Sequence, residues 1–128
     1  MSDSRTTLAE LRRLVDDFVD RRDWHQFHSP KNLAMSMAIE SAELMEHFQW
    51  LSADESRGVA RHPERLAAVA EELADVFCYL LAMANELGLD LSTAVRQKMA
   101  RNEQKYPAEQ YRGRFGPEDR GMEGGRQK

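Results

Sequence analysis

A chain of 128 residues, 41% hydrophobic and 31% charged, is long enough to bury one core without disulfides or other staples. Its formal net charge of −4 and sequence pI of about 5.6 argue against a protein that binds nucleic acid through a basic surface. Because Cys78 is the only cysteine, no disulfide can form within the chain, and we expect a reducing, cytoplasmic location.

No segment is suited to insertion into a membrane. The longest apolar run, VFCYLLAMA, is much shorter than the roughly 20 residues that a membrane-spanning helix needs. The N-terminal segment MSDSRTTLAE is polar and lacks the apolar core of a signal peptide. We therefore expect no membrane partner. Because Cys78 lies inside the apolar run, we expect a small buried thiol there rather than a nucleophile.

Two long helices are predicted in the first half of the chain. The first spans about residues 4–22, where apolar residues recur at helical spacing. The segment WHQFHSPKN interrupts this pattern, and Ser29 is then placed as an N-cap with Pro30 at the first helical position. A long second helix follows. Its apolar face is traced by Leu33, Met37, Leu44, Phe48 and Leu51.

Two further long helices are predicted in the second half. A possible capping box from Ser52 to Glu55 indicates a short helix or turn before them. The third long helix shows apolar residues in steps of three and four, and Gly88 is placed to end it. Ser92 can cap a fourth helix, which Pro107 stops. No segment has a strand period, so the sequence predicts an all-α fold, a bundle of about four helices with short connections.

The end of the chain differs in composition from the rest. Glycines crowd into the segment RGRFGPEDRGMEGGRQK, which is typical of a flexible tail. We therefore predict one all-α domain over residues 1–112 and a flexible, glycine-rich tail over residues 113–128.

Four carboxylates are placed to converge on one rim of the bundle. Glu40 and Glu43 are three residues apart on the second predicted helix, and Glu72 and Asp75 are three apart on the third. Residues at this spacing share a helix face. If the two helices pack antiparallel, the pairs meet, and acids this close repel one another unless cations lie between them. An all-oxygen donor set suits Mg²⁺ or Mn²⁺.

Two other interpretations of the acids stay open at this point. Glu-x-x-Glu pairs are common on solvated helix faces, where they do no more than keep the surface charged. A di-iron centre is the other competitor, and it normally uses Glu-x-x-His on two helices. Here His47 follows Glu43 by four residues, and the third helix has no histidine. The all-carboxylate set therefore favours Mg²⁺ and a phosphate-bearing substrate.

Aromatic side chains accompany the acids. Trp24 and Phe27 lie just before the second helix, Trp50 closes it, and Tyr79 lies on the acidic face of the third. Flat aromatic surfaces beside a metal site suggest that a nucleobase stacks there. The alternative is that the tryptophans are core anchors at helix ends.

Cationic and polar side chains extend the candidate site. Lys98 and Asn102 are four residues apart on the fourth helix. Such a run is ordinarily a solvated face, but beside a metal-bound triphosphate the same groups can hold phosphate oxygens. His28 lies where it can reach a ligand, whereas His25 and His62 are interpreted as surface residues.

Three segments carry a resemblance to a known family: RDWHQFHSPKNLAMSMAIESAELMEHFQW, EELADVFCYLLAMANELGLDL and KMARNEQKYP. Together they resemble the MazG-like all-α nucleoside triphosphate pyrophosphohydrolases, and within these the dCTP pyrophosphatase branch. The resemblance covers about residues 22–107. The family's signature, Glu-x-x-Glu and then Glu-x-x-Asp, falls on Glu40, Glu43, Glu72 and Asp75.

The resemblance implies an enzyme that cuts a nucleoside triphosphate, dCTP or a modified dCTP, into the monophosphate and pyrophosphate and so cleanses the nucleotide pool. It implies that the four acids bind Mg²⁺. The oxygen donor set also suits Mn²⁺, and we assign the catalytic role to Glu43 and Glu72. Glu43 is our choice for the group that orients or deprotonates the attacking water. The family resemblance also implies a homotetramer, a dimer of dimers with sites near subunit interfaces. The residues implied to bind the nucleotide are Trp24, His25, Gln26, Phe27, His28, Trp50, Tyr79, Lys98 and Asn102.

Two other functions stay open from the sequence. One keeps the chemistry but extends the substrates to dUTP or damaged purine triphosphates, because the hydrogen bonds that select a base are not placed by sequence. The other is a catalytically silent helical module that binds a partner. The intact acids and both tryptophans argue against that module.

Overall fold

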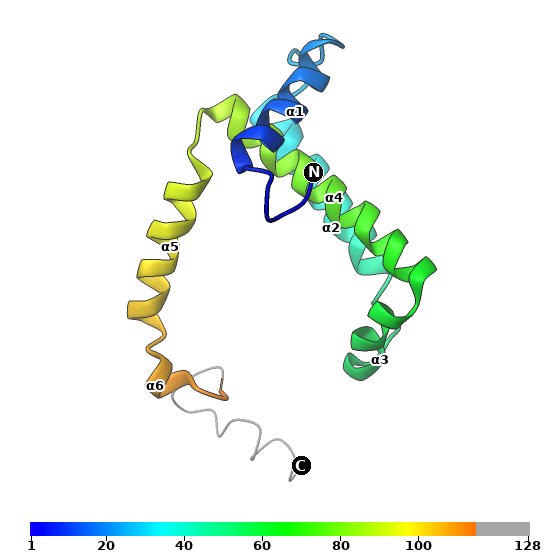
Figure 1. The fold of residues 1–128 in the computed structure, drawn as a ribbon, viewed down its shortest axis with the longest axis vertical. Helices are drawn as coiled ribbons and strands as arrows, with labels where there is room; N and C mark the ends of the chain where they lie inside the picture. Colours follow the sequence, from blue (N-terminus) through cyan, green and yellow to red (C-terminus); the bar gives the residue numbers. More distant parts are fainter. Residues whose placement is uncertain (115–128) are drawn as a thin grey trace. The chain divides into compact units, whose positions relative to one another are not determined.

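The computed structural model describes residues 1–114, and every regular element in that range is helical, as predicted (Figure 1). The chain divides into two units, residues 1–89 and residues 90 onward, and each is described by itself. Most of the predicted tail, residues 115–128, lies outside the described residues. No helix within residues 1–114 is long and apolar enough to cross a membrane. The elements are α1 (Leu8–Asp20), α2 (Pro30–Glu46), α3 (Ala53–Gly58), the 3₁₀ helix η1 (Val59–Arg61), α4 (Pro63–Leu87), α5 (Leu91–Lys105) and α6 (Ala108–Tyr111).

Two predicted helix starts and one predicted helix end are confirmed. Ser29 caps α2 and accepts a hydrogen bond from Asn32 N at 3.2 Å, with Pro30 at the first helical position. The capping box that begins at Ser52 starts α3. Gly88 ends α4 in the left-handed conformation, with a φ of 63° that glycine adopts without steric strain.

Two predicted helix starts are wrong, and in both cases a different capping side chain sets the boundary. The first helix begins at Leu8 rather than near residue 4, because a capping box closes at Thr7. The last long helix is capped by Asp90 instead of Ser92. The Asp90 carboxylate accepts a hydrogen bond from Thr93 N at 3.0 Å and satisfies an amide that the helix leaves free.

The second helix ends earlier than predicted. Its regular turns stop at Glu46, and the backbone then tightens into turns that include hydrogen bonds from one residue to the third before it. Phe48 and Leu51 therefore lie beyond α2 rather than on its apolar face. The short helix α6, which follows Pro107, was not predicted.

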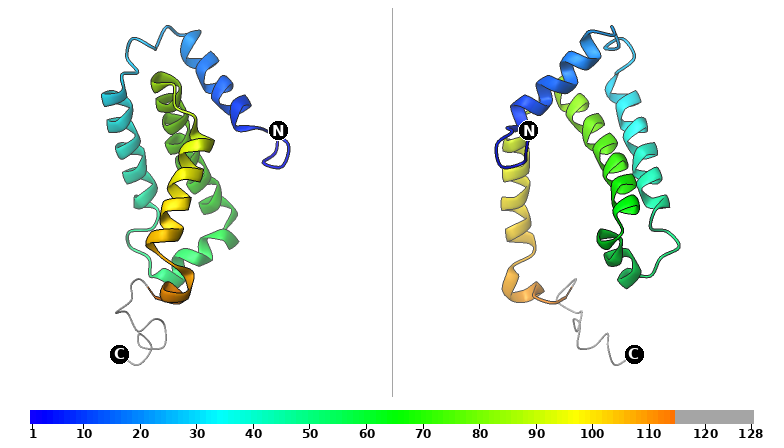
Figure 2. Two further views of the ribbon diagram at one scale, coloured as in Figure 1. Left: turned by 90° about the vertical axis from the view of Figure 1, so that its left-hand side faces the viewer. Right: turned by 45° about the vertical axis from the view of Figure 1, so that its right-hand side comes forward.

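Within the first unit, α2 and α4 run antiparallel side by side, and α1 packs against α4 (Figure 1, Figure 2). Arg12 on α1 helps to join these two helices. Its guanidinium donates hydrogen bonds to the Asn85 side chain at 3.0 Å and to the carbonyls of Ala84 and Leu89 at 3.1 and 2.6 Å. The unit thus contains three of the four predicted long helices, and the fourth, α5, belongs to the second unit.

The buried core of the described residues is small. The predicted apolar seam of α4 is only partly covered, because Leu66, Leu73 and Leu87 are 45%, 56% and 50% exposed. The side chains that are buried, all apolar, are Val19, Leu33, Val59, Leu81, Ala82 and Ala84.

Candidate metal centre and adjoining cavity

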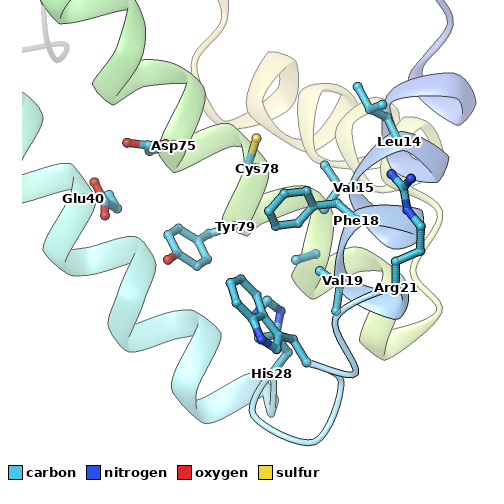
Figure 3. Close-up of a pocket in the computed structure, with 12 residues that line it drawn as sticks. Leu14, Val15, Phe18, Val19, Arg21, His28, Glu40, Asp75, Cys78 and Tyr79 are labelled. Atoms are coloured by element: carbon cyan, nitrogen blue, oxygen red, sulfur yellow. The ribbon is translucent and has the colours of Figure 1, made fainter.

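Three carboxylates meet on one side of the α2–α4 pair. One oxygen from each of Glu40, Glu43 and Glu72 lies within 4.8 Å of the other two. The antiparallel packing of α2 and α4 produces this group, because it sets the acids of one helix opposite those of the other. Asp75, the fourth predicted ligand, is outside this group of three but lines the adjoining cavity. Figure 3 shows Glu40 and Asp75 pointing into the space between the two helices.

Hydrogen bonding, burial and neighbouring negative charge raise the pKa of two acids of the group. The pKa of Glu40 rises from 4.5 to about 7, first through a hydrogen bond with Glu43, then through burial and the charges of Glu43 and Asp75. Burial and then the charge of Glu43 raise the pKa of Glu72 as well. The two shifts show that the folded chain disfavours full ionisation of these acids unless positive charge is supplied.

The carboxylate group fits a hard divalent cation. Glu40 Oε2 and Glu72 Oε2 are buried and have no hydrogen-bond partner among the described residues. Buried polar atoms are nearly always satisfied, so two orphaned carboxylate oxygens at one place call for a further partner. Oxygen-only donors close together on two rigid helices match the ligand preference of Mg²⁺ and Mn²⁺.

A cavity of about 460 Å³ adjoins the acids, within the usual size range of small-molecule sites (Figure 3). Its walls come from α1, the loop before α2, α2 itself and α4. Three predicted nucleotide-binding residues line it: Trp24, His28 and Tyr79. The Trp24 ring lies 6.3 Å from that of His28, and His28 Nδ1 is buried without a hydrogen-bond partner in the described part of the chain.

The other predicted nucleotide-binding residues of the first unit do not line this cavity. The Gln26 amide turns back to Asp23, donating to its carbonyl at 3.0 Å. Phe27 is 59% exposed, and Trp50, in the turns after α2, is 87% exposed. His25, interpreted from the sequence as a surface residue, is only partly exposed and faces acids of α1 and α4.

The two predicted contacts from α5 lie in the second unit. Lys98 is exposed. Asn102 is partly exposed, and its amide donates to Met99 Sδ at 3.7 Å. Nucleotide binding by Lys98 and Asn102 stays a prediction.

Several cavity residues were not predicted. α1 contributes Val15 and Phe18, whose ring meets Trp24 edge-on at 5.8 Å between centroids. Their helical spacing was visible in the sequence but indicated only an apolar face. Cys78 corrects the prediction of a buried thiol, because it is exposed and lines the cavity. Partial burial and then the Asp75 charge raise the pKa of the Cys78 thiol, which keeps it protonated and a poor nucleophile.

Known proteins match this chain over most of its length. The sequence profile of the MazG-like family matches residues 35–114. dCTP pyrophosphatase 1 of Rattus norvegicus is 46% identical over 107 residues, which are 84% of this chain and 63% of that protein. The Homo sapiens protein of the same name is 44% identical over 102 residues, 80% of this chain and 60% of that protein. The chain therefore spans about three-fifths of the length of these curated relatives.

A solved structure has a similar fold. The crystal structure of a pyrophosphatase from Archaeoglobus fulgidus superposes on this chain with a TM-score of 0.74 and 42% sequence identity. The match covers 84% of this chain and 98% of that one.

Proposed function

Because the chain belongs to the MazG-like family, we propose that it is a Mg²⁺-dependent nucleoside triphosphate pyrophosphohydrolase that acts on dCTP or a modified dCTP. The observation that carries this proposal is the group of Glu40, Glu43 and Glu72 beside a cavity of small-molecule size. The relatives called dCTP pyrophosphatase 1 support the choice of substrate.

In this proposal, Glu40, Glu43, Glu72 and Asp75 hold Mg²⁺, or Mn²⁺ in its place. A bound ion supplies a Lewis acid for the phosphates and makes hydroxide available near neutral pH. Glu43 orients or deprotonates the attacking water, and Glu72 is the second catalytic acid. Water adds across the bond between the α and β phosphates, so that dCMP and pyrophosphate leave. Hydrolysis in the cytoplasm would remove dCTP or damaged nucleotides from the pool.

The cavity is the proposed place for the base. Trp24, Tyr79 and Phe18 supply aromatic surface there, and the orphaned His28 Nδ1 offers a hydrogen bond to a polar edge. The remaining proposed nucleotide contacts rest on the family resemblance: His25, Gln26, Phe27, Trp50, Lys98 and Asn102.

We also propose a homotetramer, a dimer of dimers. Large apolar side chains of α2 and α4 are exposed in the single chain, among them Ile39 at 58% and Leu73 at 56%. Apolar surface on this scale is typical of faces that another chain covers. Light scattering at micromolar concentration tests the proposal, and a monomeric mass would refute it.

The reaction is tested by its products. The protein is incubated with dCTP in the presence and absence of Mg²⁺, and the products are separated by ion-exchange chromatography. We expect dCMP and pyrophosphate, formed only with the metal. Release of dCDP and orthophosphate as the first products would overturn the proposed cleavage position.

A panel of triphosphates then tests the base preference. Comparison of kcat/KM for dCTP, 5-substituted dCTP, dUTP and oxidised purine triphosphates ranks the substrates under one set of conditions. A higher value for dUTP or for the purines would reassign the substrate while keeping the reaction. Absence of hydrolysis across the panel would favour the silent module.

A further inference from the structure

The loop between α1 and α2, residues 21–29, presents two aromatic rings to the cavity. Trp24 and His28 both come from it, and a tight backbone turn joins them. His28 N donates to Trp24 O at 3.1 Å, and Phe27 N donates to the same carbonyl at 2.9 Å. Asp23, just before the turn, adopts a left-handed φ of 52°, which carries a conformational cost for any residue but glycine. The positions of the two rings therefore depend on what holds this turn.

One side chain of the turn, His25, reaches across to α4. Its Nδ1 lies 2.6 Å from Glu86 Oε1, a hydrogen bond between residues 61 positions apart. Its Nε2 lies 3.6 Å from Asp16 Oδ1 and 3.8 Å from Asp20 Oδ1, both on α1. Of the hydrogen bonds that side chains of loop 21–29 make within the described residues, this one alone joins the loop to α4.

We propose that His25 is a positioning residue, whose imidazole fixes the turn carrying Trp24 and His28 against α1 and α4 and makes nucleotide binding depend on pH. The inference deepens the proposed function and rests on it for the identity of the ligand in the cavity. His25 itself does not line that cavity, so we assign it a role through Trp24 and His28, in place of the direct nucleotide contact that the family resemblance implies.

Carboxylates face His25 from both helices packed against it. These are Asp16 and Asp20 on α1 and Glu86 on α4, and His28 of its own loop lines the same small hollow. The hydrogen bond with Glu86 raises the pKa of His25 above 6.5, with smaller contributions from the three negative charges.

The direction of the pH dependence follows from that raised pKa. The cationic ring is favoured in the folded chain, so its contribution is complete below pH 6.5 and is lost as pH rises through the folded pKa. Above the folded pKa, the neutral ring still donates one N–H to Glu86 but no longer attracts the acids of α1. The turn is therefore held most firmly in mildly acidic solution and less firmly in alkaline solution.

The first test measures the contact itself. NMR of the histidine ring protons, with His25→Ala to assign the signal, should show His25 titrating above 6.5. Glu86→Gln keeps an oxygen that accepts the hydrogen bond but removes its charge, and should lower that pKa. Glu64→Gln, an exposed change at the other end of α4, is the matched control and should leave it unchanged.

The second test measures the position of Trp24 without any substrate. In a Trp50→Phe background, Trp24 is the only tryptophan, and acrylamide quenching of its fluorescence reports its exposure. His25→Ala should increase the quenching constant, and the increase should be larger in mildly acidic than in alkaline buffer. His62→Ala, another histidine outside the cavity, should not change it.

The third test is kinetic. At about pH 6, His25→Ala should raise KM for dCTP roughly two- to fivefold with little change in kcat, the range expected for a partly exposed charged contact. The difference should shrink as pH rises through the folded pKa of His25, because the wild-type ring then loses its charge. His25→Lys keeps a cation that does not titrate in this range, so it should restore a low KM and flatten its rise with pH.

The outcomes separate the two proposals. A His25 that titrates at or below 6.5, or a Trp24 whose quenching is the same in His25→Ala, would overturn the positioning role. If the wild-type protein does not hydrolyse dCTP, the proposed function fails, and the NMR and quenching results still decide whether His25 holds the turn.

Discussion

Glu40 binds its proton more tightly than an ordinary glutamate. A hydrogen bond with Glu43, burial and nearby negative charge raise its pKa from 4.5 to about 7. A divalent cation in the carboxylate group would reverse this preference, because positive charge favours the ionised acids. A raised pKa at this residue therefore separates a crowded carboxylate group from a solvated helix face.

Glu40→Gln tests this difference in metal-free buffer. Between pH 4.5 and about 7, folded Glu40 binds more protons than unfolded Glu40, so the free energy of unfolding of the wild type falls as pH rises through this window. Glutamine does not titrate. We therefore expect the stability of Glu40→Gln relative to wild type to increase from pH 4.5 to about 7 and then to level off.

Urea denaturation across this pH range, with chelator present, measures the effect. Glu46→Gln, an exposed change at the end of the same helix, is the control. Parallel pH profiles for wild type and Glu40→Gln would contradict the raised pKa.

Asp75→Asn tests whether the fourth acid belongs to the metal centre. Asparagine keeps the shape and removes one negative charge from a crowded group, so the metal-free fold should be at least as stable as wild type. Activity should fall on the order of 10- to 100-fold or more. The increase in melting temperature that Mg²⁺ confers should also shrink, because a ligand stabilises only through preferential binding to the folded state.

Thermal melts with and without Mg²⁺, together with a pyrophosphate assay, measure these effects. Glu71→Gln, an exposed neighbour on α4, serves as the matched control and should behave as wild type. Full activity in Asp75→Asn would end its assignment as a ligand.

At the scale of helices, the contact between α1 and α4 sets the shape of the cavity. α1 supplies one wall of it, and Arg12 holds α1 to the end of α4. The guanidinium also complements the negative end of the α4 dipole, where helix carbonyls need partners. The Asn85 amide in turn donates a hydrogen bond to the Arg12 carbonyl at 3.0 Å, so each helix both donates and accepts at this contact.

Arg12→Met keeps much of the aliphatic stem and removes the hydrogen bonds. We expect it to lower the free energy of unfolding by about 1.5–3 kcal/mol, the range for hydrogen bonds to a charged group. Arg13→Met, at the next and exposed position, should change it far less. Equal denaturation midpoints for the two variants would show that Arg12 does not join the helices in solution.

At the scale of the whole molecule, several large apolar side chains are exposed to solvent in the single chain. Trp50 is 87% exposed although it is one of the predicted base-binding residues. A large aromatic side chain in water contributes nothing to the stability of its own chain. In the proposed tetramer, a neighbouring subunit would cover this ring.

Trp50→Ala separates a binding role from a core anchor. Since the side chain is exposed, the variant should fold, and its affinity for dCTP should fall by roughly 1–3 kcal/mol through lost stacking. The melting shift produced by Mg²⁺ alone should stay close to that of wild type. Calorimetric titration and melting curves measure the two effects, and a variant that does not fold would support the core-anchor alternative.

Removal of residues 113–128 tests the predicted domain boundary. If residues 1–112 carry the folded domain, the shortened protein should keep its mass in light scattering and its rate of pyrophosphate release. Loss of either property would place the boundary beyond residue 112.

Local patterns predicted much of the fold. The cap at Ser29, the capping box at Ser52 and the end at Gly88 were correct, because each depends on a few neighbouring residues. The cap at Asp90 was missed because two candidates, Asp90 and Ser92, stand close together. The premature end of α2 was missed because an apolar residue at helical spacing does not require that the helix continue.

The sequence by itself determined the helical class and the pairing of acids within each helix, since both follow from spacing along the chain. Only the tertiary structure decided that Glu40, Glu43 and Glu72 form the closest group, that Phe18 lines the cavity, and that His25 meets Glu86. These outcomes depend on how α1, α2 and α4 rotate and pack, which residues distant in sequence determine together. Spacing on one helix brings side chains to a common face, but packing alone decides what that face meets.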